Sequence, residues 1–165
     1  MVEHMPWTLR DAEEGDLSFL RLLYGSVRQD LQRLPDEMRE PLLELQFQAQ
    51  RRGYGAQYPQ ARQELIEVGG MSIGQLLTAR LAADLVLVDF SLLPDWRGQG
   101  IGGAVLQTLQ TRAQAASCGI RLQVARDNPA LHLYARHGFA TFAGDELRHA
   151  MRWDGSHESL NGTSA

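Results

Sequence analysis

An apolar run followed at once by a glycine-rich loop leaves this chain few possible folds. The run, Asp84–Leu93, is an almost continuous stretch of β-formers, which predicts a strand buried on both faces. The loop Arg97-Gly98-Gln99-Gly100-Ile101-Gly102-Gly103 follows, and the apolar periodicity after it predicts a helix over 100–117. A strand, a glycine turn and a helix N-terminus together expose backbone N–H groups at the positive end of the helix dipole. The expected ligand is a phosphate or a pyrophosphate.

The rest of the chain consists of further predicted strands and helices in alternating groups. Period-two segments predict strands at 7–10, 64–68, 71–79, 120–124, 139–142 and 147–153, and helical periodicity predicts helices at 17–31, 35–53 and 129–137. Pro41 lies inside the second helix, so that helix either starts nearer Glu40 or is kinked at Pro41. The pattern indicates one α/β or α+β domain of three layers over residues 1–153, with a frayed polar tail at 154–165.

Composition excludes several classes of function. All 16 cationic residues are Arg and the net charge is −4, so chemistry that needs a lysine, such as a Schiff base, is excluded. The Arg residues are spread along the chain, which argues against nucleic acid as a partner. The single cysteine, Cys118, has no histidine at metal-ligand spacing and cannot form an internal disulfide. With no signal peptide and no membrane-length apolar run, we expect a cytoplasmic protein without a metal or a membrane partner.

The glycine loop also fits a dinucleotide fingerprint, Gly98-x-Gly100-x-x-Gly103. Its context does not, because the preceding strand lies halfway along the chain rather than at the start of a βαβ unit. The acidic residue expected about 20 positions later, which would hold the ribose, is also missing from 118–124. An NAD-type binder is therefore the least favoured hypothesis.

A second interpretation fits better. Arg97-x-x-Gly100-x-Gly102 resembles the (Gln/Arg)-x-x-Gly-x-(Gly/Ala) pyrophosphate loop of the GNAT superfamily of acyl-CoA-dependent N-acetyltransferases. Leu92-Leu93-Pro94-Asp95-Trp96-Arg97 is similar to the Val-x-Pro-x-x-Arg that ends the preceding strand in that family. A second family motif follows about thirty residues later, as Asn128-Pro129-Ala130, Leu133-Tyr134 and Gly138-Phe139. Two motifs at this separation are more specific than either alone.

The resemblance covers residues 7–153 and implies a three-layer GNAT-type fold. Its central mixed sheet has about seven strands, splayed between the fourth (84–93) and the fifth (120–124), with helices on both faces and acyl-CoA in the gap. The cofactor residues that it implies are Leu92, Leu93, Arg97, Gly98, Gln99, Gly100, Ile101, Gly102, Gly103 and Asn128. The first two would pair with the pantetheine amides through their backbone, and the N–H groups of 99–103 would hold the pyrophosphate. A Cβ at Gly100 or Gly102 should clash.

Two of these residues have structural alternatives. Arg97 either lies along the phosphates or braces the loop, and Asn128 either ties the helix to the cofactor or caps it before Pro129.

The resemblance places Tyr134 at the general-acid position, where a phenol protonates the departing thiolate. The alternative role is a packed aromatic on a short helix. For the general base, Asp89 stands out as an acid inside the apolar run, and Asp84 and Glu67 are rivals. Asp89 could instead be a satisfied structural acid. His132 and His137 flank the tyrosine and are expected at the surface.

In this architecture the acceptor site is built by the first two helices and the hairpins. The candidates are Tyr24, Gln46, Gln50, Tyr54 and Tyr58, with the 53–59 segment as a lid loop. The leading hypothesis is acetyl transfer from acetyl-CoA to a primary amine of a small molecule or a peptide, by direct attack in a ternary complex. The alternative is a non-catalytic acyl-CoA-binding or sensing module. Dimerisation is common in the superfamily and is compatible with this sequence.

Overall fold

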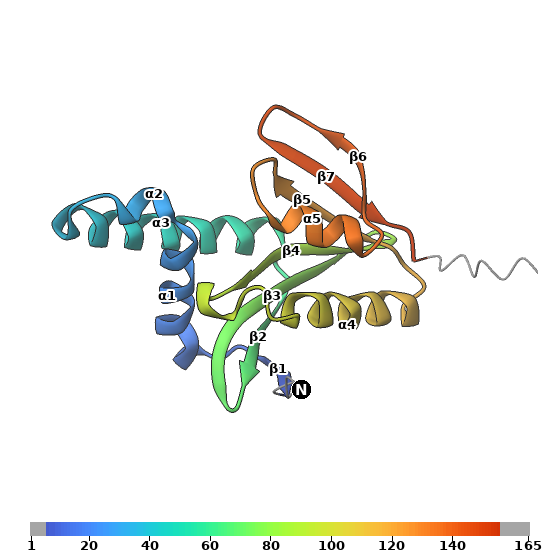
Figure 1. Cartoon of the computed structure of the whole chain (residues 1–165), viewed down its shortest axis with the longest axis horizontal. Coiled ribbons are helices and arrows are strands. Elements are labelled where there is room, and N and C mark those ends of the chain that lie inside the picture. Colours follow the sequence, from blue (N-terminus) through green and yellow to red (C-terminus); the bar gives the residue numbers. More distant parts are fainter. Residues whose placement is uncertain (1–5, 156–165) are drawn as a thin grey trace, which may run out of the picture.

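The computed structural model describes residues 6–155, so most of the expected tail at 154–165 lies outside the described residues. A seven-stranded sheet has the order β1-β2-β3-β4-β5-β7-β6 (Figure 1). The strands are β1 (Trp7–Asp11), β2 (Arg62–Val68), β3 (Met71–Leu81), β4 (Asp84–Leu92), β5 (Ile120–Ala125), β6 (Ala140–Gly144) and β7 (Arg148–Trp153). The helices are α1 (Leu17–Val27), α2 (Gln29–Gln32), α3 (Asp36–Gln57), α4 (Ile101–Ala115) and α5 (Ala130–Arg136). The order of strands and helices agrees with the one predicted from the sequence.

The sheet is mixed, and its only parallel pair, β4 and β5, splays apart after a short stretch of pairing. β4 and β5 pair only over Leu85–Leu87 and Ile120–Leu122, and the other neighbouring strands are antiparallel. Past this short ladder β4 stays with β3 as far as Leu92, while β5 stays with β7 as far as Ala125. Each strand follows its own antiparallel partner, so the two separate. The predicted splay between the fourth and fifth strands is confirmed.

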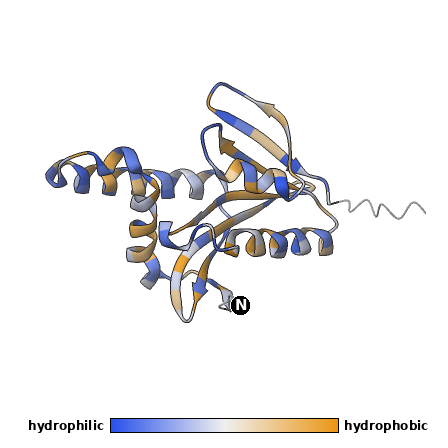
Figure 2. Ribbon diagram, viewed as in Figure 1, coloured by the Kyte–Doolittle hydropathy of each residue, from blue (hydrophilic) through white to orange (hydrophobic). Residues whose placement is uncertain are grey.

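Helices cover both faces of the sheet, which gives the predicted three layers. On one face α4 and α5 pack against the sheet in a large apolar cluster that contains Val105, Leu106, Leu109 and Tyr134. On the other, α1, α3 and β2 meet in a smaller cluster of Leu20, Phe47 and Leu65. Figure 2 shows hydrophobic residues along the central strands and on α4, whereas the part of α3 that extends beyond the sheet is largely hydrophilic.

The first predicted helix, 17–31, is interrupted in the structure. Its backbone breaks at Arg28 (φ −99°, ψ 70°), between α1 and α2. The guanidinium there donates to the Asp30 carboxylate at 2.8 and 3.0 Å and to the Tyr24 hydroxyl at 2.6 Å. These bonds hold the break in place and fix the Tyr24 ring on α1.

The second helix is longer than predicted. α3 runs from Asp36 through both Pro41 and Gly53 to Gln57, so the expectation of a lid loop at 53–59 is wrong over most of that segment. An interior glycine costs a helix about 1 kcal/mol, a penalty that packing can offset. Here the half-buried Tyr54 side chain packs toward the sheet. The backbone carbonyl of Tyr54 accepts a hydrogen bond from the Tyr58 N–H at 2.7 Å, which ends the helix.

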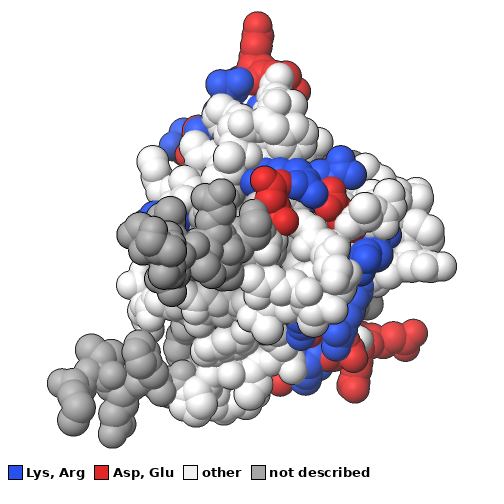
Figure 3. Space-filling view, turned by 90° about the vertical axis from the view of Figure 1, so that its right-hand side faces the viewer, with Lys and Arg blue, Asp and Glu red and all other residues white. Residues whose placement is uncertain are grey.

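Charged groups pair across the molecule. On the face in Figure 3, Arg side chains lie beside acidic ones rather than in one large basic patch. The fully buried Glu64 carboxylate on β2 accepts two bonds from Arg112 of α4, at 2.6 and 3.0 Å, which fixes α4 against the sheet. In the part of the chain that the structure describes, no helix is both long enough and apolar enough to span a membrane.

Candidate active site

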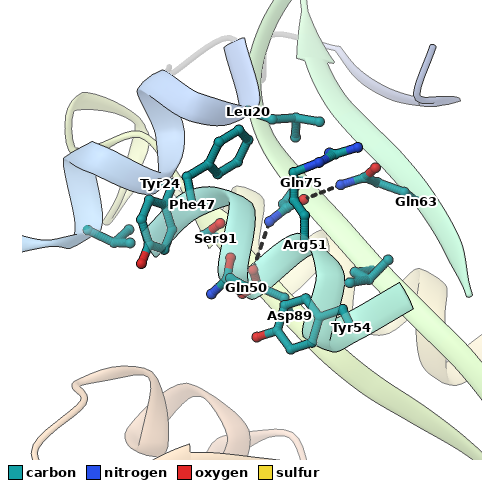
Figure 4. Close-up of a pocket in the computed structure, with 12 residues that line it drawn as sticks. Leu20, Tyr24, Phe47, Gln50, Arg51, Tyr54, Gln63, Gln75, Asp89 and Ser91 are labelled. Atoms are coloured by element: carbon teal, nitrogen blue, oxygen red, sulfur yellow. Dashed lines mark hydrogen bonds between the residues drawn. The ribbon is translucent and has the colours of Figure 1, made fainter. Parts of the chain in front are cut away.

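A pocket of about 90 Å³ opens between α1, α3 and the sheet, beside the splayed end of β4 (Figure 4). Its lining combines aliphatic, aromatic and polar side chains from five elements. They are Leu20, Tyr24, Val27, Phe47, Gln50, Arg51, Tyr54, Gln63, Gln75, Leu77, Asp89 and Ser91. Of the acceptor candidates from the sequence, Tyr24, Gln50 and Tyr54 line it, whereas Gln46 and Tyr58 do not.

Strand register explains why polar groups gather here. Gln63, Leu77 and Asp89 are cross-strand neighbours on β2, β3 and β4, and Gln75 is opposite Ser91 one row along. Side chains two residues apart share a face of the sheet, so all of these point toward α1 and α3. The sequence analysis missed both strand glutamines and the serine. Their signal was a polar residue at alternate positions of otherwise apolar strands.

Asp89 has an unusual environment for a carboxylate. It is half-buried in the pocket and accepts a 2.7 Å hydrogen bond from Nε2 of Gln75, whose Oε1 accepts from Nε2 of Gln63 at 2.9 Å. Loss of hydration raises its pKa from 3.8 to about 6, against the opposing effect of hydrogen bonds from the Phe90 N–H and Gln75. Among residues 6–155 no cation forms an ion pair with it. The group therefore changes charge just below neutral pH.

The two rival acids lie elsewhere and are neutralised by arginines. Asp84 is bound by Arg152 at 2.9 Å, and the hydrogen bond from that guanidinium lowers its pKa. Glu67 on β2 is bound by Arg10 at 2.8 Å. Neither carboxylate lines the pocket, whereas Asp89 does.

Tyr134 lies on α5, across the splayed gap from β4. Its buried ring packs against Phe139, with the ring centres 5.8 Å apart. Burial and, second, the negative charge of Asp89 raise the pKa of the phenol, so the carboxylate acts on it electrostatically. The hydroxyl has no hydrogen-bond partner within residues 6–155. It is not among the fully buried side-chain polar atoms that lack a partner, of which the described residues contain only Nδ1 of His149. The tyrosine is thus a packed aromatic whose hydroxyl reaches open space.

The two flanking histidines have no place in the pocket. His132 is exposed, as expected. His137 is half-buried, its Nδ1 2.9 Å from the Leu133 carbonyl, and its own carbonyl accepts from Gln110 of α4 at 2.7 Å. It joins α5 to α4.

The glycine loop leads into α4 with its backbone turned outward. Gly98 and Gly100 have φ of +73° and +85°, a region that favours glycine. No described atom of the chain lies within 4 Å of a Cβ added at either residue. Gly100 is therefore required for its backbone conformation, and the clash predicted for a Cβ there does not occur with the protein itself. A Cβ at Gly102 would be 3.3 Å from the Leu133 side chain.

The start of α4 is suited to an anion. Its first intrahelical bond runs from the Ala104 N–H to the Gly100 carbonyl at 3.2 Å, so the N–H groups of 101–103 precede the helical ladder. The cap residue is a glycine, with no side chain to accept them. These donors, with the helix dipole, fit a pyrophosphate.

Other residues of the predicted cofactor set are already engaged within the chain. Arg97 Nε donates to the Leu92 carbonyl at 3.1 Å, which braces the loop. Asn128 Oδ1 accepts the Ala130 N–H at 2.9 Å, which caps α5. The Leu93 N–H donates to Ile73 on β3 at 2.8 Å. In an antiparallel pair the backbone N–H and C=O groups of successive residues point to opposite edges of the strand. Since Leu93 bonds to β3, the backbone groups of Leu92 point to the other edge of β4, toward the gap.

Comparison with known proteins agrees with these features. A family model described as an acetyltransferase (GNAT) domain matches residues 61–141, which include β2–β5, the glycine loop, α4 and α5. Residues 61–141 therefore contain a GNAT acetyltransferase domain. This family consists of acyltransferases that use acetyl-CoA. None of the curated proteins compared with the chain matches it.

Solved GNAT structures share the fold at low sequence identity. One is the PaiA N-acetyltransferase of Thermoplasma acidophilum in complex with coenzyme A, with a TM-score of 0.72, 16% identity, and coverage of 91% of this chain and 99% of that one. Another is the ribosomal-protein-S18-alanine N-acetyltransferase of Escherichia coli, with a TM-score of 0.68, 18% identity, and coverage of 94% and 98%. A spermidine N-acetyltransferase chimera that includes the Vibrio cholerae protein has a TM-score of 0.64, 21% identity, and coverage of 90% and 95%.

Over residues 6–155, no three His, Cys, Asp or Glu side chains cluster closely enough to hold an ion.

Proposed function

We propose that this protein transfers an acetyl group from acetyl-CoA to a primary amine by direct attack in a ternary complex. The observation that carries the proposal is Asp89: a carboxylate with a raised pKa and no cation partner in the described chain, lining a pocket where β4 separates from β5. An acid at such a position with a raised pKa and no ion-pair partner is typical of a proton-transfer group.

The base must take a proton from an ammonium ion. With a pKa of about 6, Asp89 is ionised at neutral pH, yet it is more basic than an ordinary carboxylate. The ammonium gives up its proton, and the neutral nitrogen attacks the thioester carbonyl. The Gln63–Gln75 pair holds the carboxylate in a fixed orientation through the 2.7 Å bond to Gln75.

The acid must protonate the leaving thiolate. When the C–S bond breaks, the sulfur takes a proton from Tyr134, the group that the family resemblance assigns to this role. Its raised pKa keeps the phenol protonated until a strong base forms beside it. The apolar surroundings that raise this pKa also raise the basicity of a thiolate in the same gap, which favours the transfer.

For the cosubstrate, we propose that the N–H groups of 101–103 bind the pyrophosphate and that the backbone of Leu92 pairs with the pantetheine arm as a neighbouring strand would. Arg97 supports this loop through the Leu92 carbonyl. The acetyl group would then lie in the gap between Asp89 and Tyr134.

Thiol release from acetyl-CoA over a panel of amines tests the proposal. Tyr134→Phe and Asp89→Asn should each lower kcat by ~10²-fold or more, the usual contribution of general acid–base catalysis, with CoA affinity retained. Asp36→Asn, at the exposed start of α3, serves as the matched control and should leave kcat unchanged.

The alternative, a non-catalytic acyl-CoA-binding module, predicts a different result. Wild type would bind CoA but release no thiol with any amine, and Tyr134→Phe would be without effect. That outcome would refute the catalytic proposal.

A further inference from the structure

The charges that line the pocket point to a particular kind of acceptor. Asp89 is the only acidic residue among its lining residues and Arg51 is the only basic one; the others are neutral. Resting on the proposed acetyl transfer, we infer that the acceptor is a small zwitterion of the amino-acid class. Its amine lies at Asp89 and its anionic group at Arg51.

Arg51 is available for a ligand. Its guanidinium stacks on the Phe47 ring, 5.7 Å from the ring centre, and within residues 6–155 it forms no ion pair. Arg28, at the end of the neighbouring helix α1, is different, because Asp30 and the Tyr24 hydroxyl already occupy it. A stacked guanidinium without a carboxylate partner is well suited to bind one from a ligand with two parallel hydrogen bonds.

The stacking also gives Arg51 a defined position. Phe47 belongs to the small core between α1, α3 and β2, and it is fixed there by burial and by contact with the Tyr24 ring, 5.7 Å away. A guanidinium held on a rigid ring loses less conformational entropy on binding than a free side chain does. Arg51 is an exposed residue that also lines the pocket, so its stacked guanidinium is accessible to a ligand there.

A second cation reinforces the same preference. Burial and the Asp89 charge raise the pKa of Tyr54 to about 12, while Arg148, at the start of β7, acts in the opposite direction. That guanidinium is thus within electrostatic reach of the pocket, and in the described chain it has no ion-pair partner. With Asp89 as the only carboxylate and Arg51 as the only cation in its lining, the pocket favours an acceptor with one ammonium and disfavours a polyamine, whose further ammonium groups would find no second carboxylate.

Neutral polar groups complete the match. Gln50, Tyr54 and Ser91 add amide and hydroxyl groups to the lining. A cavity of about 90 Å³ has room for a few waters or a small polar head group, but not for a large folded surface. A protein N-terminus also presents a small head group, but it has no carboxylate beside its amine for Arg51 to bind.

The test compares acceptors that differ only in their negative charge. Thiol release is measured with the twenty free amino acids, with the amide of each, with spermidine and with an uncharged tripeptide amide. The best free amino acid should exceed its own amide in kcat/KM by about 10- to 100-fold, the effect of one charge-assisted bidentate contact. Spermidine or the tripeptide amide as the preferred acceptor would overturn the inference.

A pair of variants on α3 locates the effect. Arg51→Gln should raise KM for the amino acid and reduce its advantage over the amide, with little change in kcat. Arg52→Gln is the matched control: this neighbouring guanidinium lies along the helix, 3.4 Å from the Gln48 carbonyl, and does not line the pocket. Equal discrimination in wild type and Arg51→Gln would contradict the assignment.

Binding separates this inference from the proposed function. Melting temperatures are measured with CoA plus each amino acid or its amide. A rise that needs the carboxylate and disappears in Arg51→Gln supports the zwitterion site even if no amine is turned over, and in that case only acetyl transfer fails. With CoA bound, the absence of any such rise in wild type, together with no preference for the free acid in turnover, overturns the inference.

Discussion

The two ends of β4 each carry an aspartate, and the two residues behave in opposite ways. At the closed end, where β4 pairs with β5, Asp84 is buried between Arg152 and Arg121 at 2.9 and 3.0 Å, and its pKa is lowered. At the open end Asp89 accepts hydrogen bonds from the Gln75 amide and the Phe90 N–H but has no guanidinium partner, and burial raises its pKa to about 6. The side chains are chemically identical, so the neighbours determine whether the charged form of the carboxylate is stabilised or destabilised in the folded protein.

The splay provides the physical basis of this difference. At the closed end β5 and β7 bring Arg121 and Arg152 to within ion-pair distance of β4. At the open end β5 has turned away with β7, so neither strand places a guanidinium within ion-pair distance of Asp89. The same separation that leaves room for a ligand thus leaves the carboxylate without a partner.

The largest expected effect is on the pH dependence of turnover. Because the proposed mechanism requires ionised Asp89, kcat/KM should rise about tenfold per pH unit up to a midpoint near pH 6 and then level off. Initial rates between pH 4.5 and 8 measure this. The residual activity of Asp89→Asn should lack the acidic limb; the same limb in that variant would show that another group is titrating.

The next effect is a gain in stability on removing the open-end charge. The raised folded pKa means that the folded state binds the proton more tightly than the unfolded chain, so wild type loses stability as pH rises from about 4 to 6. Asp89→Asn should avoid this loss and be more stable above pH 6, by up to about 3 kcal/mol for a shift of roughly two pKa units. Urea unfolding at pH 4 and pH 8 checks it: the advantage should be present only at pH 8.

At the closed end, removing the charge should lower the stability of the fold instead of raising it. Asp84→Asn removes a carboxylate that two guanidiniums stabilise, and should lower the free energy of unfolding at pH 7 by about 2 kcal/mol. Because the folded pKa is lowered, this contribution is present above the ordinary pKa and fades as pH falls through the folded one. If Asp84→Asn instead stabilised the protein at pH 7, the contrast between the two ends would be lost.

The smallest effect tests the amide that holds Asp89. Gln75→Met removes a hydrogen bond to the charged form, which should raise the pKa of Asp89 and move the acidic limb upward by less than one unit. At pH 6 kcat/KM should fall about two- to fivefold, whereas at pH 8 it should change little. Gln107→Met, on the exposed face of α4, is the control. A uniform loss across the pH range would indicate a role in packing instead.

Much of the fold could be predicted because its signals are local. The alternation at β2 and β3, the apolar run of β4 and the glycine entry to α4 each specify an element within a few residues of sequence. The errors arose where a distant contact decides the outcome. Gly53 is a helix breaker by propensity, yet α3 continues past it because Tyr54 packs toward a sheet that lies far from it in sequence.

The site divides in the same way. The glycine loop is one contiguous segment, so the sequence alone contains the whole of the proposed pyrophosphate site. The pocket combines side chains from five elements, and the sequence analysis included Tyr54 but not Gln63, Gln75 or Arg51. A glutamine in a strand reads as an ordinary solvent-facing residue until the strand register shows which face it shares with Asp89.

By itself the sequence determined the order of the elements, the family motifs and the presence of an acid within an apolar strand, because each depends on neighbours along the chain. Only the tertiary structure decided which acid has no cation partner, since that depends on where β4 and β5 separate. It likewise decided that Arg51 lines the same pocket without an ion-pair partner among residues 6–155, because pairing between side chains depends on three-dimensional proximity.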